Sequence, residues 1–142
     1  MFVDTYQKRI RYGETDQMGY LYYGNYPQLY EIGRVEALRS LGIRYKDCEE
    51  VYKVMLPVLE LNARYLRPAL YDDLVTIETR ILEMPTKMIV FNHRIFNEAG
   101  DLLNKGEVKL FFVDMVENKR VSCPSFISDK IKLHFWKNTL EN

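Results

Sequence analysis

The sequence is poor in the residues that build metal sites and disulfide frameworks. Its 142 residues include only two cysteines and two histidines. Cys48 and Cys123 have neither the CxxC spacing nor the neighbouring histidines that zinc sites and redox motifs require. We therefore expect no metal, no disulfide and a reducing compartment.

Apolar stretches of membrane length are also missing. No run approaches the roughly 20 apolar residues that a spanning helix needs. The first ten residues, MFVDTYQKRI, carry charges where a signal peptide has its apolar core. These features predict a soluble, cytoplasmic protein without a membrane span.

The charges balance, with 20 lysines and arginines against 20 aspartates and glutamates. A net charge of zero gives no electrostatic preference for nucleic acid or for an acidic membrane, so we expect no nucleic-acid partner. The length suits one ordinary domain and is too short for two. Without an internal repeat, a low-complexity segment or a linker, residues 1–142 are predicted to form a single domain.

One long helix is predicted over residues 26–41. Apolar residues recur there at three- and four-residue steps. Asn25 is a candidate N-cap, Pro27 falls in the first turn, and Gln28 completes the spacing of a capping box. Gly42 is a plausible stop for the helix. Further apolar residues lie off the main stripe, so we expect the helix to be covered on more than one side.

The rest of the chain alternates with a period of two, which is typical of strands. A first strand is predicted over residues 2–12, and Gly106 is expected to mark a bulge or bend in the last strand. Residues 125–136 are predicted to form a short helix. The remaining strands are predicted over residues 54–68, 74–82, 88–96 and 102–115.

These elements predict an α+β fold in which an antiparallel sheet wraps around one long central helix. A single curled sheet leaves its edge strands and part of its surface uncovered. Dimerisation is the simplest way to cover them.

Two blocks of sequence resemble a known family. Residues 12–26, YGETDQMGYLYYGNY, are similar to the active-site loop of hotdog-fold acyl-CoA thioesterases of the 4-hydroxybenzoyl-CoA thioesterase type. Residues 62–79, NARYLRPALYDDLVTIET, resemble that family's second and third strands. The resemblance extends from about Arg11 to Val113, and it implies the hotdog fold and hydrolysis of an acyl-CoA thioester without metal or dissociable cofactor.

The resemblance also implies where the site lies. The family's catalytic carboxylate falls on Asp16, and its oxyanion donor, a backbone amide at the start of the central helix, falls on Tyr23. A helix start presents free N–H groups and a positive dipole to a carbonyl oxygen. An acid placed just before it can act as nucleophile or as the base that activates water.

Other substrate contacts are expected from the same resemblance. A branch of the family associated with the Tol–Pal envelope system usually has histidine at the position of Tyr23, and this chain departs from it. Three basic residues, Lys87, Lys119 and Arg120, fall where the family meets the nucleotide end of coenzyme A. The other residues expected to bind substrate are Gly19, Tyr22, Asn25 and Pro57.

Each of these assignments has a competing interpretation. By its local sequence alone, Asp16 is a turn aspartate that bonds its own backbone. Glu31 and Glu36 on the helix are rival acids, because other hotdog enzymes use a helix glutamate. His93 and His134 are expected to be packed or hydrogen-bonded rather than catalytic.

Three functions remain open from the sequence. The leading hypothesis is an acyl-CoA thioester hydrolase, acting as a homodimer or homotetramer, with acyl carrier protein thioesters as a second substrate class. A hotdog hydratase or dehydratase needs a histidine base, which residues 13–25 lack. A non-catalytic module that binds acyl thioesters is the third.

Overall fold

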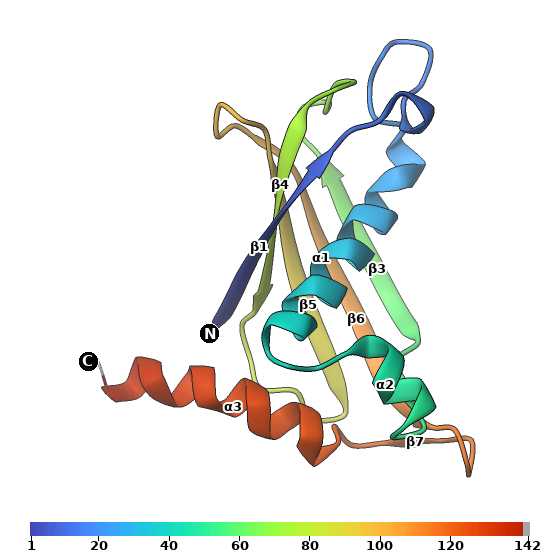
Figure 1. The fold of residues 1–142 in the computed structure, drawn as a ribbon, viewed down its shortest axis with the longest axis vertical. Coiled ribbons are helices and arrows are strands. Elements are labelled where there is room, and N and C mark those ends of the chain that lie inside the picture. The colour runs from blue at the N-terminus through green and yellow to red at the C-terminus, as the bar shows by residue number, and fades with distance from the viewer. Residues whose placement is uncertain (141–142) are drawn as a thin grey trace.

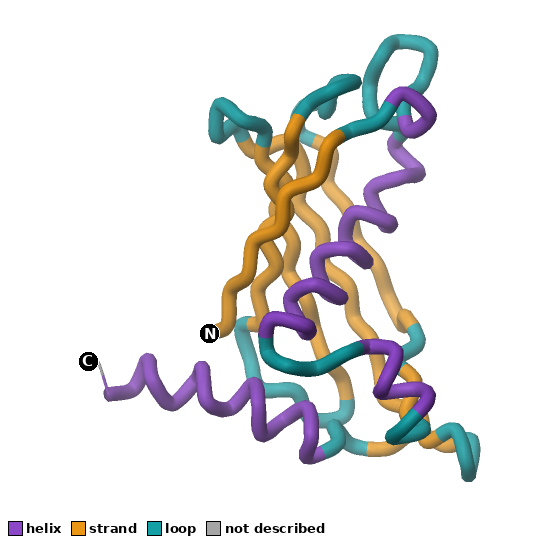
Figure 2. The backbone as a smooth tube through the Cα atoms, viewed as in Figure 1, coloured by secondary structure: helices purple, strands orange, loops and turns teal. Residues whose placement is uncertain are grey.

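A curled antiparallel sheet holds one long helix against its concave face (Figure 1). The computed structural model describes residues 1–140, and their side chains up to residue 135. Figure 2 shows the strands as one layer, with the helix lying along it. The strands are β1 (Phe2–Arg9), β2 (Val54–Met55), β3 (Val58–Tyr65), β4 (Leu74–Ile81), β5 (Met88–Phe96), β6 (Leu102–Asp114) and β7 (Lys119–Val121). The helices are α1 (Tyr26–Ser40), α2 (Tyr45–Glu50) and α3 (Ser125–Leu140), with short 3-10 turns η1 (Tyr12–Glu14) and η2 (Tyr23–Asn25).

The α+β arrangement predicted from the sequence is confirmed. Strands β4, β5 and β6 form an antiparallel meander, and β1 pairs with β4 on one side. Strand β3 crosses to the other side and pairs with β6. The predicted first strand was too long, because β1 ends at Arg9 and the chain turns into η1 at Tyr12.

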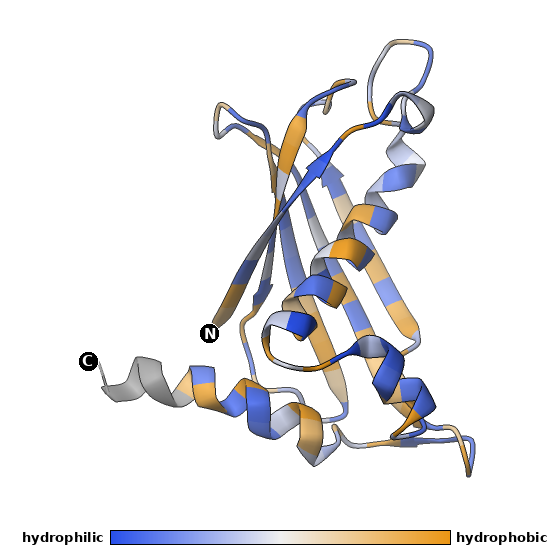
Figure 3. Ribbon diagram, viewed as in Figure 1, coloured by the Kyte–Doolittle hydropathy of each residue, from blue (hydrophilic) through white to orange (hydrophobic). Residues whose placement is uncertain are grey.

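Helix α1 buries one face against the sheet, along the stripe of its three- and four-residue periodicity. The expectation that it is covered on more than one side is not met within the described residues, where Ile32 and Val35 are only half-buried. Its apolar residues alternate with polar ones along the ribbon in Figure 3. The helix ends as expected, with Gly42 in the left-handed region at φ 81°. The Gly42 carbonyl accepts a hydrogen bond of 2.8 Å from Lys130 Nζ of α3. The predicted C-terminal helix is confirmed as α3, which continues beyond the predicted residues to Leu140, and Lys130 attaches it to the turn that follows α1.

Two glycines allow α1 to approach the sheet closely. A methyl group at Gly33 would lie 2.6 Å from Thr79 Oγ1, and one at Gly106 would overlap the ring of Tyr30. The expectation of a bulge at Gly106 was wrong, because the pairing of β5 with β6 shifts between Ile95 and Phe96 instead. Gly106 is needed because the hydroxyl end of the Tyr30 ring occupies the space that a Cβ would fill there.

Tyr30 anchors a small polar cluster beneath α1. Its hydroxyl donates to Asn104 Oδ1, and its ring stacks on His93 at 5.0 Å. His93 Nδ1 lies 3.1 Å from Thr79 Oγ1, while Nε2 has no partner among the residues described. Burial, followed by the positive charge of Arg34, lowers the pKa of His93 to about 3. His93 is therefore a neutral core residue, as the sequence predicted.

The lowered pKa of His93 predicts a loss of stability in acid. An unfolded chain binds a proton to histidine below about pH 6.5, whereas the folded chain does not until about pH 3. This group therefore costs no stability above pH 6.5, and costs about 1.4 kcal/mol per pH unit as the pH falls from 6.5 towards 3. Between pH 7 and pH 5, urea unfolding of the wild type should lose about 2 kcal/mol more than that of His93→Gln. Equal losses in the two proteins would contradict the prediction.

Candidate active site

A tight loop between β1 and α1 carries Asp16. Its two arms pair at Thr15 and Leu21, and its tip closes through a 2.8 Å bond from Asp16 N–H to the Tyr20 carbonyl and a 3.0 Å bond from Gly19 N–H to the Asp16 carbonyl. Gly19 adopts φ 78°, a conformation that favours glycine. Gly19 therefore shapes the turn that presents Asp16.

The two oxygens of the Asp16 carboxylate have different surroundings. Oδ1 accepts hydrogen bonds from the N–H groups of Met18 (2.9 Å) and Tyr20 (3.1 Å). Oδ2 has no hydrogen-bond donor within residues 1–135, and the side chain is exposed. Asp16 is thus a turn aspartate, as its local sequence indicates, and it also keeps one oxygen free. The same bonds that close the turn fix the direction of that oxygen.

Unengaged N–H groups gather where the central helix begins. The 3-10 turn η2 precedes α1, and the N–H groups of Asn25 and Tyr26 bond the carbonyls of Tyr22 and Tyr23. For the N–H groups of Tyr23 and Gly24, no acceptor is present in the part of the chain that the structure describes. The expectation of a capped start was wrong, because no side chain caps α1. The helix start is therefore open to an acceptor from outside.

Asp16 and Tyr23 line the same hollow, which has a volume of about 340 Å³. Its walls are mostly aromatic and aliphatic. A second hollow of about 410 Å³ lies on the other side of Asp16. The first is lined by Asp16, Tyr20, Leu21, Tyr23, Tyr26, Tyr65, Leu66, Arg67 and Pro68. The second is lined by Tyr12, Thr15, Asp16, Gln17, Gly19 and Tyr71.

Strand β3 contributes a tyrosine to the first hollow. The Tyr65 hydroxyl donates a 2.9 Å hydrogen bond to the Tyr23 carbonyl, and its ring meets Tyr26 edge-on at 5.0 Å. Tyr65 and its neighbour Arg67 were not identified from the sequence. The predicted strand over residues 54–68 includes Tyr65, but the strand pattern did not show that this residue meets the helix start.

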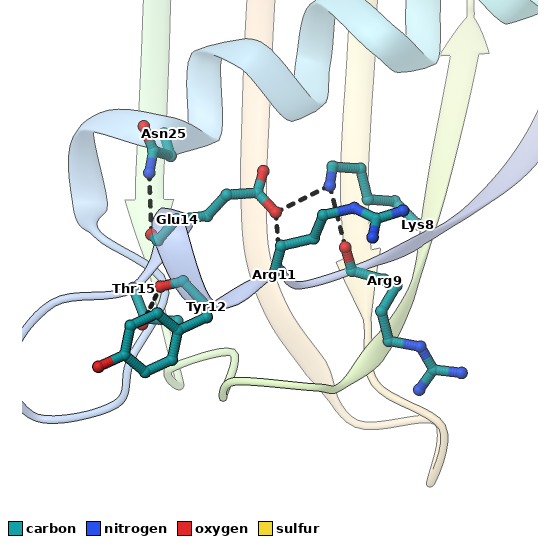
Figure 4. A network of polar contacts seen from close by, with 7 residues as sticks. All are labelled: Lys8, Arg9, Arg11, Tyr12, Glu14, Thr15 and Asn25. Carbon is teal, nitrogen blue, oxygen red and sulfur yellow. Dashed lines mark hydrogen bonds and ion pairs between the residues drawn. The ribbon is translucent and has the colours of Figure 1, made fainter.

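Glu14 holds the loop between the sheet and the helix (Figure 4). Its carboxylate accepts hydrogen bonds from Lys8 Nζ at 2.9 Å and from Arg11 N–H at 2.8 Å. Its carbonyl accepts bonds from Tyr22 N–H at 3.0 Å and from Asn25 Nδ2 at 2.9 Å. Burial alone would raise the pKa of Glu14, but the bonds from Lys8 and Arg11 and their charges lower it below its usual value. No local pattern in the sequence indicated this role.

The remaining predicted contacts of the loop have different surroundings. Asn25 was expected to cap the helix and contact substrate, but its side chain bonds the Glu14 carbonyl. The Tyr22 ring packs on Tyr23 at 4.7 Å and lies outside the lining of both hollows. Pro57 precedes β3 at the far end of that strand, and its carbonyl accepts a bond from Phe111 N–H.

Two of the three predicted basic residues lie together. Lys87 and Arg120 line a hollow of about 460 Å³ beside Phe111, with the Arg120 guanidinium 4.1 Å above the Phe111 ring. Lys119, which precedes Arg120 in the chain, is paired with Glu117. This basic hollow adjoins the Val58 end of β3, whereas Asp16 adjoins the Tyr65 end. Seven residues of strand, or about 23 Å, separate those two ends.

The rival acids and histidines lie outside the two hollows at Asp16. Glu36 pairs with Arg39 at 3.7 Å, and Glu31 is exposed on α1. His134 meets Phe2 edge-on at 4.9 Å. Within the described chain, no group of three or more histidines, cysteines and acids is placed to hold a metal ion. No helix among those residues is long and apolar enough to cross a membrane.

Comparisons with known proteins agree with this geometry. The sequence profile described as Thioesterase superfamily matches residues 18–104, which is more than half of the chain. The acyl-CoA thioester hydrolase YbgC of Escherichia coli O157:H7 is 32% identical over 124 residues, covering 87% of this chain and 92% of that protein. The profile match begins two residues after Asp16, so it does not include the carboxylate.

Two solved structures share the fold closely. The DHNA-CoA thioesterase of Staphylococcus aureus superposes with a TM-score of 0.87 at 28% identity, covering all of this chain and 95% of that one. A mutant 4-hydroxybenzoyl CoA thioesterase, in complex with 4-hydroxybenzoyl CoA, superposes with a TM-score of 0.81 at 25% identity. That superposition covers 94% of this chain and 99% of the other. The hotdog fold implied by the two sequence blocks is confirmed.

Proposed function

We propose that this chain, which belongs to the thioesterase superfamily, hydrolyses an acyl-CoA thioester to a free acid and coenzyme A with Asp16 as its catalytic carboxylate. One observation carries the assignment of residues. The free oxygen of Asp16 and the open helix start at Tyr23 border a single hollow with apolar walls. An acid and an oxyanion donor are the two groups that acyl transfer requires.

The chemistry follows from where charge develops. The N–H groups of Tyr23 and Gly24, at the positive end of the α1 dipole, stabilise the oxyanion that forms when the thioester carbonyl is attacked. Asp16 either attacks the carbonyl carbon itself or removes a proton from an attacking water. In the first route the acyl group moves to the carboxylate, coenzyme A leaves as a thiolate, and water then hydrolyses the anhydride. Both routes give the same products.

The competing functions receive less support from the site. A hydratase or dehydratase needs a histidine base beside the substrate. His93 is buried in the core and His134 packs on Phe2, so neither is available in the Asp16 hollows. A non-catalytic binding module would bind a non-hydrolysable acyl-CoA and leave the cleavable one intact. A panel of short, medium, long-chain and aromatic acyl-CoAs, together with acyl carrier protein thioesters, distinguishes a thioesterase from a binding module, because only the thioesterase releases free thiol.

The site of one chain is divided between two ends of its sheet. The outer edge of β3 is unpaired among the described residues, and its side chains include the exposed Val58, Leu59 and Leu61. An open, apolar edge of this kind favours pairing with another strand. Antiparallel pairing of two β3 strands about a twofold axis would bring Pro57 and the basic hollow of one copy towards Asp16 of the other. We therefore place the complete site in a homodimer, or in a homotetramer built from dimers.

The first prediction concerns Asp16. Asp16→Asn keeps the size of the side chain and its Oδ1 bonds but removes the charge, so folding and acyl-CoA binding should persist. Turnover should fall by at least about a hundredfold, the usual effect of losing a catalytic acid or base. Thiol release measured on the best substrate of the panel tests this.

Glu31→Gln and Glu36→Gln are the matched controls, since both remove one carboxylate from the nearby helix. Each should change the rate little. Near wild-type turnover by Asp16→Asn would refute the assignment, and an inactive control variant would transfer it to that glutamate.

The second prediction concerns coenzyme A. Lys87 and Arg120, with Lys119 beside them, are proposed to hold its phosphates by charge-assisted bonds that weaken with salt. The triple variant Lys87→Ala, Lys119→Ala, Arg120→Ala should lose efficiency on full acyl-CoA but not on a short pantetheine thioester, which lacks the nucleotide. If the ratio of the two efficiencies is unchanged, these residues do not bind the nucleotide.

The third prediction concerns assembly. Light scattering should give at least twice the 17.0 kDa of one chain. Leu61→Asp places a charge on the open edge and should lower the mass towards that of one chain, with loss of turnover. Val116→Asp, in the exposed β6–β7 turn, should leave the mass unchanged. A wild-type mass of 17.0 kDa would rule the dimer out.

A further inference from the structure

The loop that carries Asp16 is attached to its surroundings at two places. Its far arm bonds residues 69–71, where Leu21 N–H donates to the Ala69 carbonyl at 2.8 Å and Tyr71 N–H donates to the Gly19 carbonyl at 2.9 Å. Its near arm is attached through Glu14 to both the sheet and the helix start.

Strand β1 is held firmly at its end, where Ile10 N–H bonds the Asp73 carbonyl at 2.8 Å and Asp72 N–H bonds the Ile10 carbonyl at 2.9 Å. The Glu14 carboxylate binds to this fixed strand end through Lys8 and Arg11. Glu14 is therefore tied to the sheet by its side chain.

The backbone of the same residue is tied to the helix start. The Glu14 carbonyl accepts hydrogen bonds from Tyr22 N–H and from Asn25 Nδ2. Asp16 follows Glu14 by two residues, and Tyr23 follows Tyr22 by one. The distance between the carboxylate and the open N–H groups is thus set across Glu14, from both sides.

We propose that Glu14 is a positioning residue for the catalytic loop, and that its ion pair with Lys8 fixes the separation between Asp16 and the oxyanion donors at the start of α1. This inference rests on the proposed function, because it assigns Glu14 a role in the same site. Glu14 itself lies outside the lining of both hollows at Asp16. Glu14 acts by positioning Asp16 and the start of α1 rather than by contacting the substrate.

Small displacements at this point have large effects on rate. Attack on a carbonyl requires the reacting atoms within about 3.5 Å and correctly aligned, and an error of about 1 Å costs on the order of a hundredfold. Without the Glu14 carboxylate, the bonds from Lys8 and Arg11 are lost together. Towards β1, residue 14 then keeps only the 3.0 Å backbone bond from its N–H to the Arg11 carbonyl, so its carbonyl is held less firmly against the sheet and the turn that presents Asp16 can move with it.

The chain offers a matched control in Glu78. Its carboxylate accepts two bonds from Arg94, at 2.7 and 3.0 Å, and pairs with Arg80 at 3.3 Å. Its side chain is 16% exposed, against 20% for Glu14. Glu78 lies on β4 and contacts neither the loop nor the helix start, so its loss tests the general cost of removing a half-buried carboxylate.

The experiment compares Glu14→Ala, Glu14→Gln and Glu78→Ala in the full-length protein on the best acyl-CoA of the panel. Glu14→Ala should lower kcat at least about tenfold and change KM less than about threefold, because the groups that bind the nucleotide are elsewhere. Glu14→Gln keeps an acceptor for Arg11 N–H but removes the charge of the ion pair with Lys8, so it should recover only part of the rate. Glu78→Ala should keep the wild-type kcat.

A second measurement does not depend on turnover. Amide hydrogen exchange at Tyr22 should become faster in Glu14→Ala, because its acceptor is no longer held in place, and should be unchanged in Glu78→Ala. If the wild-type protein showed no turnover, the proposed function would be refuted. Hydrogen exchange at Tyr22 would still test whether Glu14 attaches the loop to the sheet. If Glu14→Ala does not fold, Lys8→Met removes the ion pair alone, with an expected kcat loss that Lys8→Arg restores.

Several outcomes would overturn the proposal. One is a folded Glu14→Ala with kcat within twofold of wild type, and another is a loss confined to KM. An equal loss of kcat in Glu78→Ala would show that the effect is general destabilisation. Unchanged exchange at Tyr22, or an unchanged kcat in Lys8→Met, would show that the ion pair does not hold the loop.

Discussion

The close approach of α1 to the sheet is the constraint on which the rest of the molecule depends. Gly33 on the helix and Gly106 on β6 remove the side chains that would keep the two surfaces apart. Tyr30 occupies the space over Gly106, stacks on His93 and bonds Asn104. Because the Tyr30 ring is held by its stack on His93, its bond to Asn104 and its contact at Gly106, the height of α1 above the sheet is fixed at this contact. The position of the first turn of α1 is fixed as a consequence.

A fixed helix start is useful only if the preceding acid is fixed against it. The structure does this with backbone bonds, since Oδ1 of Asp16 closes its own turn and the Glu14 carbonyl holds Tyr22. The polar groups at the site therefore point in set directions before any substrate arrives. Preorganisation of this kind is the main source of electrostatic stabilisation in acyl transfer. Family membership gives the reaction, and these bonds explain how this chain arranges it.

The same sheet that positions the Asp16 loop also separates it from the basic hollow. Lys87 and Arg120 lie where β5 begins and β7 ends, about 23 Å along the strands from the level of Tyr65. An acyl-CoA is a long molecule with its thioester at one end and the phosphates of its nucleotide at the other. The open edge of β3 offers a way to bring the two groups together. If two copies paired antiparallel along β3, the basic hollow of one copy would lie near the Asp16 loop of the other.

The sequence by itself determined most of the elements and indicated the chemistry, but it did not predict α2 or β7 and it joined β2 and β3 into one strand. Period-two segments gave the strands, the helical stripe and Gly42 gave α1, and the loop around Asp16 with the block at residues 62–79 indicated the family. These signals lie within short stretches, where side-chain periodicity and turn chemistry act. Tertiary structure decided the rest. The bond between Tyr65 and Tyr23 joins residues 42 positions apart, and the bonds of Glu14 depend on where the chain returns to the sheet, so no local pattern records them.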